Sequence, residues 1–182
     1  MIYTPLPLSG AYRIDLERRE DSRGFFARCF CEDEFSRHGL KARWIQINMS
    51  YNRSRGTLRG MHFQRPPEAD AKVVSCVRGA AHDVIVDLRA GSPTYGKWCA
   101  VDIDETNKSM IYVPEGFAHG FQTTRADTEL VYFHSTAYAP AYEGGIRYDD
   151  PTLSIDWPIP VTNVSERDLA HPLIGDIEPF RL

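Results

Sequence analysis

The strongest constraint on the fold is the strict alternation of apolar and polar residues in one segment near the middle of the chain. In "WIQINMSYN" (44–52), one set of alternate residues is apolar and the other is polar: Ile45, Ile47, Met49 and Tyr51 against Gln46, Asn48 and Ser50. Successive side chains of a β-strand point to opposite faces of its sheet. A period of two residues therefore predicts a strand with one apolar and one polar face.

Segments of similar character follow at short intervals. Each is bounded by the turn residues Gly, Ser or Pro, and together they cover residues 56–64, 72–79, 81–89, 97–104, 109–116, 117–124 and 129–138. The clearest helix is "CEDEFSRHG" (31–39), whose first turn is acidic and whose Gly39 stands where helices commonly end. Short, regularly spaced strands with Pro and Gly turns predict an all-β fold of antiparallel sheets, in a sandwich or a barrel.

The length of 182 residues suits one domain that can bury a continuous core. No internal repeat, low-complexity run or linker divides the chain, so we expect a single domain over residues 1–182. The last thirty residues are rich in Pro and Asp. We expect them to wrap around the barrel rather than to form a second domain.

Charge and cysteine usage argue against several classes of function. The net charge is −4 and basic residues do not cluster, which argues against a nucleic-acid surface. We expect neither a secretory signal nor a membrane span, because no charged start precedes a long apolar run and no stretch approaches roughly 20 apolar residues. The cysteines lack paired zinc spacings, so we expect reduced thiols in the cytoplasm: Cys29, Cys31, Cys76 and Cys99.

The segment "GTLRGMHFQ" (56–64) places Arg59 and His62 in an otherwise apolar run. An unbroken strand would point these two side chains to opposite faces. They can share a site only if the strand shifts phase between them, and Gly60 is the natural place for a bulge. His62 is then a candidate base and Arg59 a candidate anion clamp. Taken alone, these residues favour a core histidine bonded to a backbone carbonyl and an arginine that reaches the rim, because buried polar groups usually need only partners.

Further polar residues fall in neighbouring strand segments. Lys72 opens one strand, His119 lies in the glycine-containing "PEGFAHGF", and Tyr132 and Tyr138 would share a face of an unbroken strand. Two histidines, two cations and two phenols in one pocket fit an anionic ligand such as a diphosphate, together with a proton-transfer centre. For the tyrosines, simple cross-strand packing is the alternative.

A series of motifs runs along nearly the whole chain: "RGFF", "QINMSYNRSRGTLRGMHFQ", "KVVSCVRG", "DVIVDLRAGSPTYGKW", "VPEGFAHGFQT", "EGGIRYDDPTLSIDWP" and "SERD". In sequence and in order, these motifs resemble the dTDP-4-dehydrorhamnose 3,5-epimerase family. The resemblance implies a cupin-type antiparallel jelly-roll barrel with a few short helices, and a homodimer whose N-terminal strands exchange. It also implies an isomerase that acts on nucleotide-linked 4-keto-6-deoxyhexoses without a metal or another cofactor.

The resemblance also implies residue roles. His62 resembles the family's proton-abstracting base, Asp168 of "SERD" the carboxylate that orients it, and Tyr132 the phenol that returns a proton to the opposite face. The expected substrate-binding residues are Arg23, Gln46, Asn48, Arg59, Lys72, His119, Tyr138, Glu143 and Arg167.

The implied chemistry is consistent with these residue types. A keto group at carbon 4 acidifies the C–H bonds at carbons 3 and 5. A neutral imidazole held by a carboxylate can remove such a proton. The enolate oxygen then needs a fixed cation or donor, for which we choose Lys72. We therefore expect conversion of dTDP-4-dehydro-6-deoxy-D-glucose to dTDP-4-dehydro-L-rhamnose.

Some positions depart from the family's pattern. Arg28 stands where the family commonly has an acidic residue near the nucleotide base, so the identity of the substrate's nucleotide stays open. Phe133 replaces a common lysine, and Ala137 precedes Tyr138 where paired tyrosines are usual. These changes leave the expected proton-transfer residues in place but can reshape the sugar pocket. Epimerisation at carbon 3 alone or carbon 5 alone therefore stays an alternative.

Two further classes of protein compete with the epimerase. A metal-dependent cupin enzyme would use His62, Gln64, Glu68 and His119 as ligands, although glutamine is a poor substitute for imidazole and Glu68 lies in a Pro-rich stretch. A sugar-nucleotide binding protein without catalysis would keep the pocket. It would have no need for a base opposite an acid.

Overall fold

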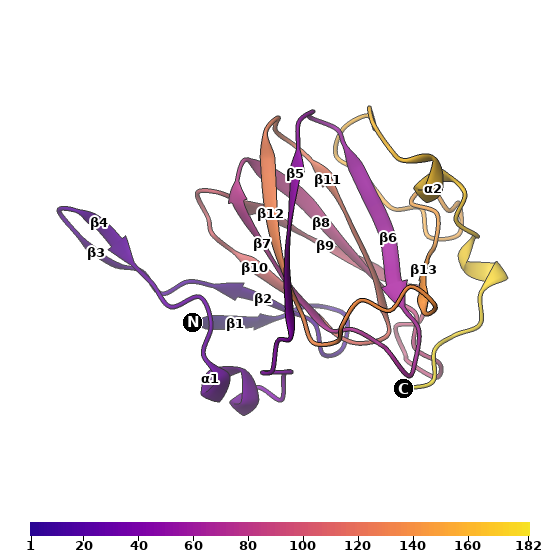
Figure 1. The fold of residues 1–182 in the computed structure, drawn as a ribbon, viewed down its shortest axis with the longest axis horizontal. Coiled ribbons are helices and arrows are strands. Elements are labelled where there is room, and N and C mark those ends of the chain that lie inside the picture. The colour runs from indigo at the N-terminus through magenta and orange to yellow at the C-terminus, as the bar shows by residue number, and fades with distance from the viewer.

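Two antiparallel β-sheets that face each other form the body of the protein, in a computed structural model that describes residues 1–182 (Figure 1). The first sheet has six strands in the order β1 (Ile2–Pro5), β2 (Tyr12–Asp15), β10 (Met110–Val113), β7 (Lys72–Arg78), β12 (Thr128–His134) and β5 (Gln46–Asn52). The second has five, in the order β13 (Glu143–Gly145), β6 (Leu58–Gln64), β11 (Phe117–Thr123), β8 (Ala80–Asp87) and β9 (Trp98–Asp104).

The main core fills the space between the sheets. Val74 and Leu130 of the first sheet pack in one cluster with Ile85 and Phe121 of the second, and all four are almost completely buried. Residues from both inner faces thus interdigitate, as expected for stacked sheets. The prediction of an all-β fold with antiparallel sheets is confirmed, and the arrangement is a jelly roll.

The C-terminal residues pack on the outer face of the five-stranded sheet. Leu153, Ile174, Ile177 and Phe180 form a second core cluster with residues of that sheet, among them Phe63. This part of the chain contains only the short helix α2 (Glu166–Leu169) and a single 3-10 turn (Ile174–Asp176). The prediction that the last residues wrap the barrel is confirmed.

The N-terminal region carries the expected helix and an unexpected hairpin. Helix α1 (Glu32–Arg37) has three acidic residues in its first turn, and Gly39 follows it with φ +70°. The two-stranded hairpin of β3 (Arg19–Asp21) and β4 (Gly24–Phe26) projects away from the sandwich (Figure 1). Neither α1 nor α2 has the length and apolar character that a membrane-spanning helix requires.

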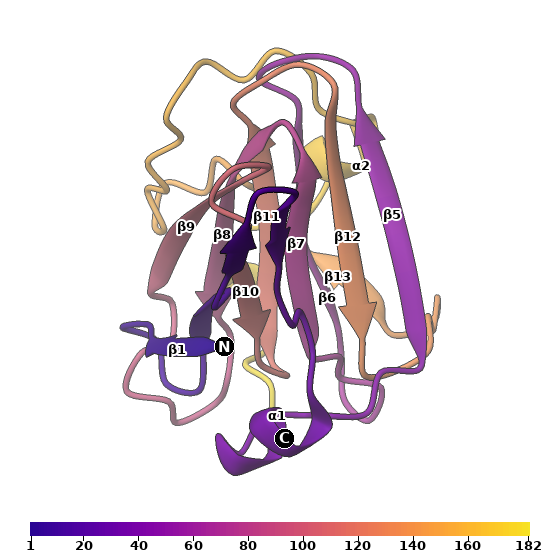
Figure 2. The same cartoon turned by 90° about the vertical axis from the view of Figure 1, so that its left-hand side faces the viewer.

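Strand β5 lies at the edge of the six-stranded sheet, as Figure 2 shows. Its apolar face is turned to solvent rather than to the core, since Ile47 is 61% exposed and Met49 65%. Ile45 and Tyr51 are exposed in the same row. The period of two residues correctly predicted the strand, but the polar face, which includes the buried Asn52, is the less exposed of the two.

The strand expected over 129–138 is shorter than the sequence indicated. Strand β12 ends at His134, so Tyr138 lies beyond it in a loop and is 55% exposed. The expectation that an unbroken strand places Tyr132 and Tyr138 on one face was therefore wrong. The chain bends after His134. There the backbone N–H of Thr136 donates to Oδ1 of Asp70 at 3.2 Å.

The phase shift expected in β6 is present. His62 pairs with His119 of β11, whereas Arg59 pairs with Phe121, so three residue steps on β6 oppose two on β11. The extra residue lies next to Gly60, which has φ +127°. Arg59 and His62 consequently line the same cavities.

Gly60 cannot carry a side chain without disturbing this bulge. A Cβ atom there would stand 2.6 Å from the Cα of Gly120 on β11. We predict that Gly60→Ala lowers the free energy of unfolding by about 2–5 kcal/mol, through backbone strain and overpacking together.

The matched control for Gly60→Ala is Gly24→Ala. Gly24 has nearly the same φ, +129°, but nothing lies within 4 Å of its added Cβ atom. Only the strain of about 1–3 kcal/mol applies there. Urea unfolding of both variants measures the difference, and equal losses of stability would contradict the importance of the close approach.

Candidate active site

A group of adjoining cavities opens between the two sheets. One of about 240 Å³ and one of about 280 Å³ share Asn48, His62, Lys72 and His134 in their walls. A third, of about 330 Å³, lies on the other side of His62 and is bordered by Asp168. A larger cavity of about 360 Å³ lies apart from these, between the base of the β3–β4 hairpin and α1. It contains none of the residues expected to transfer protons.

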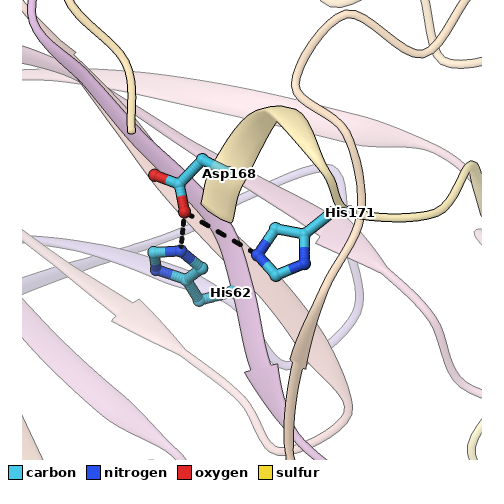
Figure 3. A group of neighbouring side chains, drawn as sticks. All are labelled: His62, Asp168 and His171. Carbon is cyan, nitrogen blue, oxygen red and sulfur yellow. Dashed lines mark hydrogen bonds and ion pairs between the residues drawn. The ribbon is translucent and has the colours of Figure 1, made fainter. Parts of the chain in front are cut away.

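His62 and Asp168 form a hydrogen-bonded pair, as expected (Figure 3). Nε2 of His62 lies 2.7 Å from Oδ1 of the buried Asp168. The other carboxylate oxygen accepts the backbone N–H of Gly60 at 3.3 Å, and Ser165 caps α2 by accepting the N–H of Asp168. A carboxylate can only accept, so Nε2 carries the proton of the neutral ring. Nδ1 is then the nitrogen with a free lone pair.

The pKa of Asp168 lies below its ordinary value. Burial acts to raise this pKa, but the hydrogen bond and charge of His62, with the N–H of Gly60, outweigh the effect of burial. Asp168 is therefore a carboxylate at neutral pH, and it can stabilise an imidazolium that forms on His62.

Tyr132 reaches the cavity from the opposite wall. It lies on β12 of the six-stranded sheet, whereas His62 lies on β6 of the five-stranded sheet, and both line the 280 Å³ cavity. The phenol oxygen is 2.8 Å from Oγ of Ser50. Burial raises the pKa of Tyr132 well above its ordinary value, although the bond to Ser50 works against this rise. The phenol thus keeps its proton at neutral pH.

Lys72 lines both central cavities and begins β7, as the sequence indicated. Its Nζ is 3.9 Å from Oδ2 of the buried Asp70. Burial lowers the pKa of Lys72, while the charges of Asp70, Asp83 and Glu143 act to raise it. The amino group of Lys72 thus lies in the cavity that His62 and Tyr132 also line.

His119 and Arg59 complete this part of the cavity. Nε2 of the buried His119 lies 2.9 Å from both carboxylate oxygens of Asp83. Nε of Arg59 donates to Oδ1 of Asn52 at 2.7 Å. Arg59 lines the cavities on both sides of His62, so its guanidinium can meet an anionic part of a ligand from either.

Most of the remaining predicted residues line the 240 Å³ cavity. The phenol of Tyr138 donates to Glu143 at 2.6 Å, and Arg167 pairs with the same carboxylate oxygen at 2.6 Å. Gln46 accepts the backbone N–H of Tyr138 and donates to the side chain of Asn48. Apart from Arg167, which borders the cavity beside Asp168, these residues line the same 240 Å³ cavity as His62.

Arg23 and Arg28 lie apart from this site within one chain. Arg23 follows β3 at the turn of the projecting hairpin, is 88% exposed in its side chain, and pairs with Asp21 at 2.6 Å. Arg28 pairs with Glu34 of α1 at 2.7 Å.

The pair of His134 and Asp70 was missed from the sequence. Nδ1 of His134 is 2.7 Å from Oδ2 of Asp70, and its Nε2 is 3.4 Å from the side-chain nitrogen of Asn48. The imidazole lines both central cavities. One signal was available, since His134 follows Tyr132 by two residues and so lies on the same face of β12.

The ligand set expected for a metal-dependent cupin does not assemble. The amide of Gln64 donates to the backbone oxygens of Glu68 and Ala137 and accepts the N–H of Ala139. Nε2 of His119 is hydrogen-bonded to the carboxylate of Asp83. Neither Glu68 nor His119 belongs to the group of potential ligand atoms that lies around His62, which comprises His62, Asp168 and His171.

Fold and site together define a class of protein: an antiparallel jelly roll with a His–Asp pair and a phenol on opposite walls of one cavity. A family model described as dTDP-4-dehydrorhamnose 3,5-epimerase matches residues 5–176. The chain belongs to this family of isomerases, and the fold is the cupin-type jelly roll that the motifs implied.

Known proteins resemble the chain over most of its length. A dTDP-4-dehydrorhamnose 3,5-epimerase from Sinorhizobium fredii is 39% identical over 178 residues, which cover 97% of this chain and 91% of the relative. A dTDP-4-dehydrorhamnose 3-epimerase from Streptomyces niveus is 42% identical over 173 residues, 94% of this chain and 83% of the relative. The crystal structure of a Legionella pneumophila 3,5-epimerase with dTDP-4-keto-L-rhamnose has a TM-score of 0.91 at 35% identity, covering 97% of this chain and 94% of that chain.

The electrostatics of Lys72 give a test of the site. We predict that its ammonium titrates below the ordinary lysine value of about 10.4, and that Asp70→Asn lowers this pKa further by removing the nearest negative charge. The ¹³C NMR shift of the Lys72 side chain, assigned by its loss in Lys72→Gln, reports the titration. Glu129→Gln, which removes the half-buried partner of the exposed Arg78, is the control. An unchanged or raised pKa in Asp70→Asn would contradict the assignment.

Proposed function

We propose that the protein epimerises a nucleotide-linked 4-keto-6-deoxyhexose at carbons 3 and 5. The observation that carries this proposal is the placement of His62 and Tyr132 on opposite walls of one cavity. Inversion of a carbon requires that a proton leaves from one face and returns to the other. A base and an acid on facing sheets meet that requirement, and a purely binding protein has no need of it.

In the first step, Nδ1 of His62 takes the proton from the carbon beside the keto group. The ring becomes an imidazolium, which Asp168 stabilises through Nε2. The electrons of the C–H bond move into an enolate, and the ammonium of Lys72 stabilises the charge on its oxygen.

In the second step, Tyr132 returns a proton to the opposite face of the same carbon, and the enolate collapses to the inverted ketone. The raised pKa of the phenol keeps it protonated until the enolate, a stronger base, is formed beside it. Solvent restores the proton of Tyr132 and removes that of His62. The same pair acts on carbon 3 and on carbon 5 in turn.

The substrate that we propose is dTDP-4-dehydro-6-deoxy-D-glucose, converted to dTDP-4-dehydro-L-rhamnose. The Legionella relative holds dTDP-4-keto-L-rhamnose, which supports a sugar of this kind. Arg59 supplies a guanidinium suited to the diphosphate, with His119 and Lys72 close by. Gln46, Asn48, Tyr138, Glu143 and Arg167 would contact the rest of the ligand.

A mono-epimerase is the second candidate. The Streptomyces niveus relative, at 42% identity, is a 3-epimerase. The nucleotide is also open, because Arg28 replaces the usual acidic residue. Trapping the product of the wild-type protein with a 4-keto reductase decides how many centres are inverted, and parallel reactions with other nucleotides decide specificity.

The two proton-transfer residues should fail in different ways. We predict that His62→Ala loses both inversion and exchange of substrate protons with heavy water, by about 10²–10⁴-fold. Tyr132→Phe should lose inversion to a similar extent but still exchange protons, because His62 can remove a proton and return a deuteron to the same face. Proton NMR in heavy water measures exchange, and reductive trapping measures inversion.

The control for these variants is Tyr95→Phe, which alters a phenol outside the three cavities around His62. It should leave both rates unchanged. Inversion that persists in Tyr132→Phe would remove the phenol from the mechanism. Exchange of substrate protons that persists in His62→Ala would show that His62 is not the base.

We further propose that two copies form a homodimer through the exposed apolar row of β5, with exchange of their N-terminal strands. The row comprises Ile45, Ile47, Met49 and Tyr51 and lies on an edge strand, whose unpaired surface proteins usually cover. Exchange would carry the projecting hairpin to another copy, which would give Arg23 a place beside a ligand.

Charge introduced into this row should prevent association. We predict that Met49→Asp converts the dimer to a monomer in sedimentation measurements, because an aspartate cannot be buried there without a partner. Tyr95→Asp, at an exposed aromatic residue outside the row, should leave the dimer intact. A wild-type monomer, or a dimer unaffected by Met49→Asp, would contradict this interface.

We also propose that residues 1–182 act as a single epimerase domain that needs no metal or other cofactor. A cytoplasmic location stays a prediction from cysteine usage.

A further inference from the structure

A second histidine stands beside the His62–Asp168 pair. His171 lies in the loop after α2, and its Nε2 is 3.7 Å from Oδ1 of Asp168, the same oxygen that contacts His62. The two imidazole rings meet edge to face, with centroids 5.6 Å apart. Figure 3 shows both rings directed at that oxygen.

The nitrogen of His171 that faces Asp168 has no hydrogen-bond partner. Nε2 is buried, and 3.7 Å is too long for a hydrogen bond to the carboxylate. Gly145 borders the ring so closely that a Cβ there would stand 2.4 Å from Nε2. A buried nitrogen without a partner normally needs an explanation.

We propose that His62, Asp168 and His171 form a binding site for a divalent transition-metal ion, best suited to Zn²⁺, and that occupation of this site inhibits the enzyme. Each residue offers one donor atom, and the three atoms lie within 4.8 Å of one another. Tetrahedral zinc with bonds of about 2.1 Å separates its donors by about 3.4 Å. Side-chain movements of about an ångström therefore bring the three donors to zinc distances. Two imidazoles and one carboxylate are a familiar donor set for this ion.

Inhibition follows from the tautomer of His62, and this part of the inference rests on the proposed function. A metal ion bound to Nε2 takes the lone pair of that nitrogen, so the single proton of the neutral ring moves to Nδ1. Nδ1 is the atom that should receive the substrate proton. The ion also binds the negatively charged carboxylate of Asp168, which then no longer stabilises an imidazolium on His62. Binding of the metal thus removes the base without displacing any residue of the opposite wall.

Metal binding can be measured without turnover. The metal-free protein is titrated with Co²⁺, whose visible absorption is intense in tetrahedral sites, and Zn²⁺ is then added as the competitor. We expect one equivalent to bind at micromolar concentration. His171→Ala and His171→Gln should each weaken binding by about 100-fold or more, since the loss of a ligand exceeds the 10–100-fold effect of losing a second-shell partner.

The control is His82→Ala. His82 forms another His–Asp pair, 2.7 Å from Asp102, and its Nε2 is also buried without a partner, but no third ligand stands beside it. His82→Ala should bind Co²⁺ as the wild type does. Epimerisation by the wild type should fall as Zn²⁺ is added and recover with a chelator, whereas His171→Ala should retain activity in the same zinc concentrations.

Three results would overturn the site: no stoichiometric Co²⁺ binding, a Co²⁺ affinity in both His171 variants equal to that of the wild type, or equal zinc inhibition of wild type and His171→Ala. The proposed function fails separately. If the protein binds Co²⁺ through His171 but exchanges no substrate proton in heavy water, the metal site stands and the epimerase assignment falls.

Discussion

The close approach of β6 to β11 at Gly60 is the constraint on which the rest of the site depends. The two backbones meet where neither strand carries a Cβ atom, and the extra residue of the bulge is accommodated there. On one side of Gly60 lies Arg59 and on the other His62, which a regular strand would point to opposite faces. The bulge thus lets one strand direct two polar side chains to the same cavities. Met61 and Phe63 of that strand still pack in the second core cluster, on the outer face of the five-stranded sheet.

A second constraint comes from the C-terminal segment. Its apolar residues pack on the outer face of the five-stranded sheet, and this packing positions the short helix that carries Asp168. The carboxylate then binds both the His62 ring and the backbone of Gly60, so one residue orients the base and fixes the bulge that presents it. Stability and catalysis are therefore linked at Asp168. The opposite wall, with Tyr132, Lys72 and His134, belongs to the other sheet, and the core between the sheets sets its distance from the base.

Part of this arrangement follows from the sequence. Alternation predicted most strands, and Gly60 predicted the phase shift. The same alternation could not show that the apolar face of β5 is turned outward, because the pattern separates two faces without saying which is buried. Asp168 lies 106 residues from His62, and only the family motif connected them. His171 carried no signal, since its place depends on how the tail folds back, and Tyr138 was misplaced because nothing in the sequence marked the end of β12 at His134.

The central claim is that Asp168 holds His62 in the tautomer with a proton on Nε2 and a free lone pair on Nδ1. The most direct test is ¹⁵N NMR of the protein with labelled histidine at neutral pH, in which the two nitrogens of a neutral imidazole have well-separated shifts. The account predicts a protonated Nε2 and an unprotonated Nδ1 for His62, with this preference lost in Asp168→Asn. A proton on Nδ1 in the metal-free wild type, or a preference unchanged in Asp168→Asn, would contradict the account.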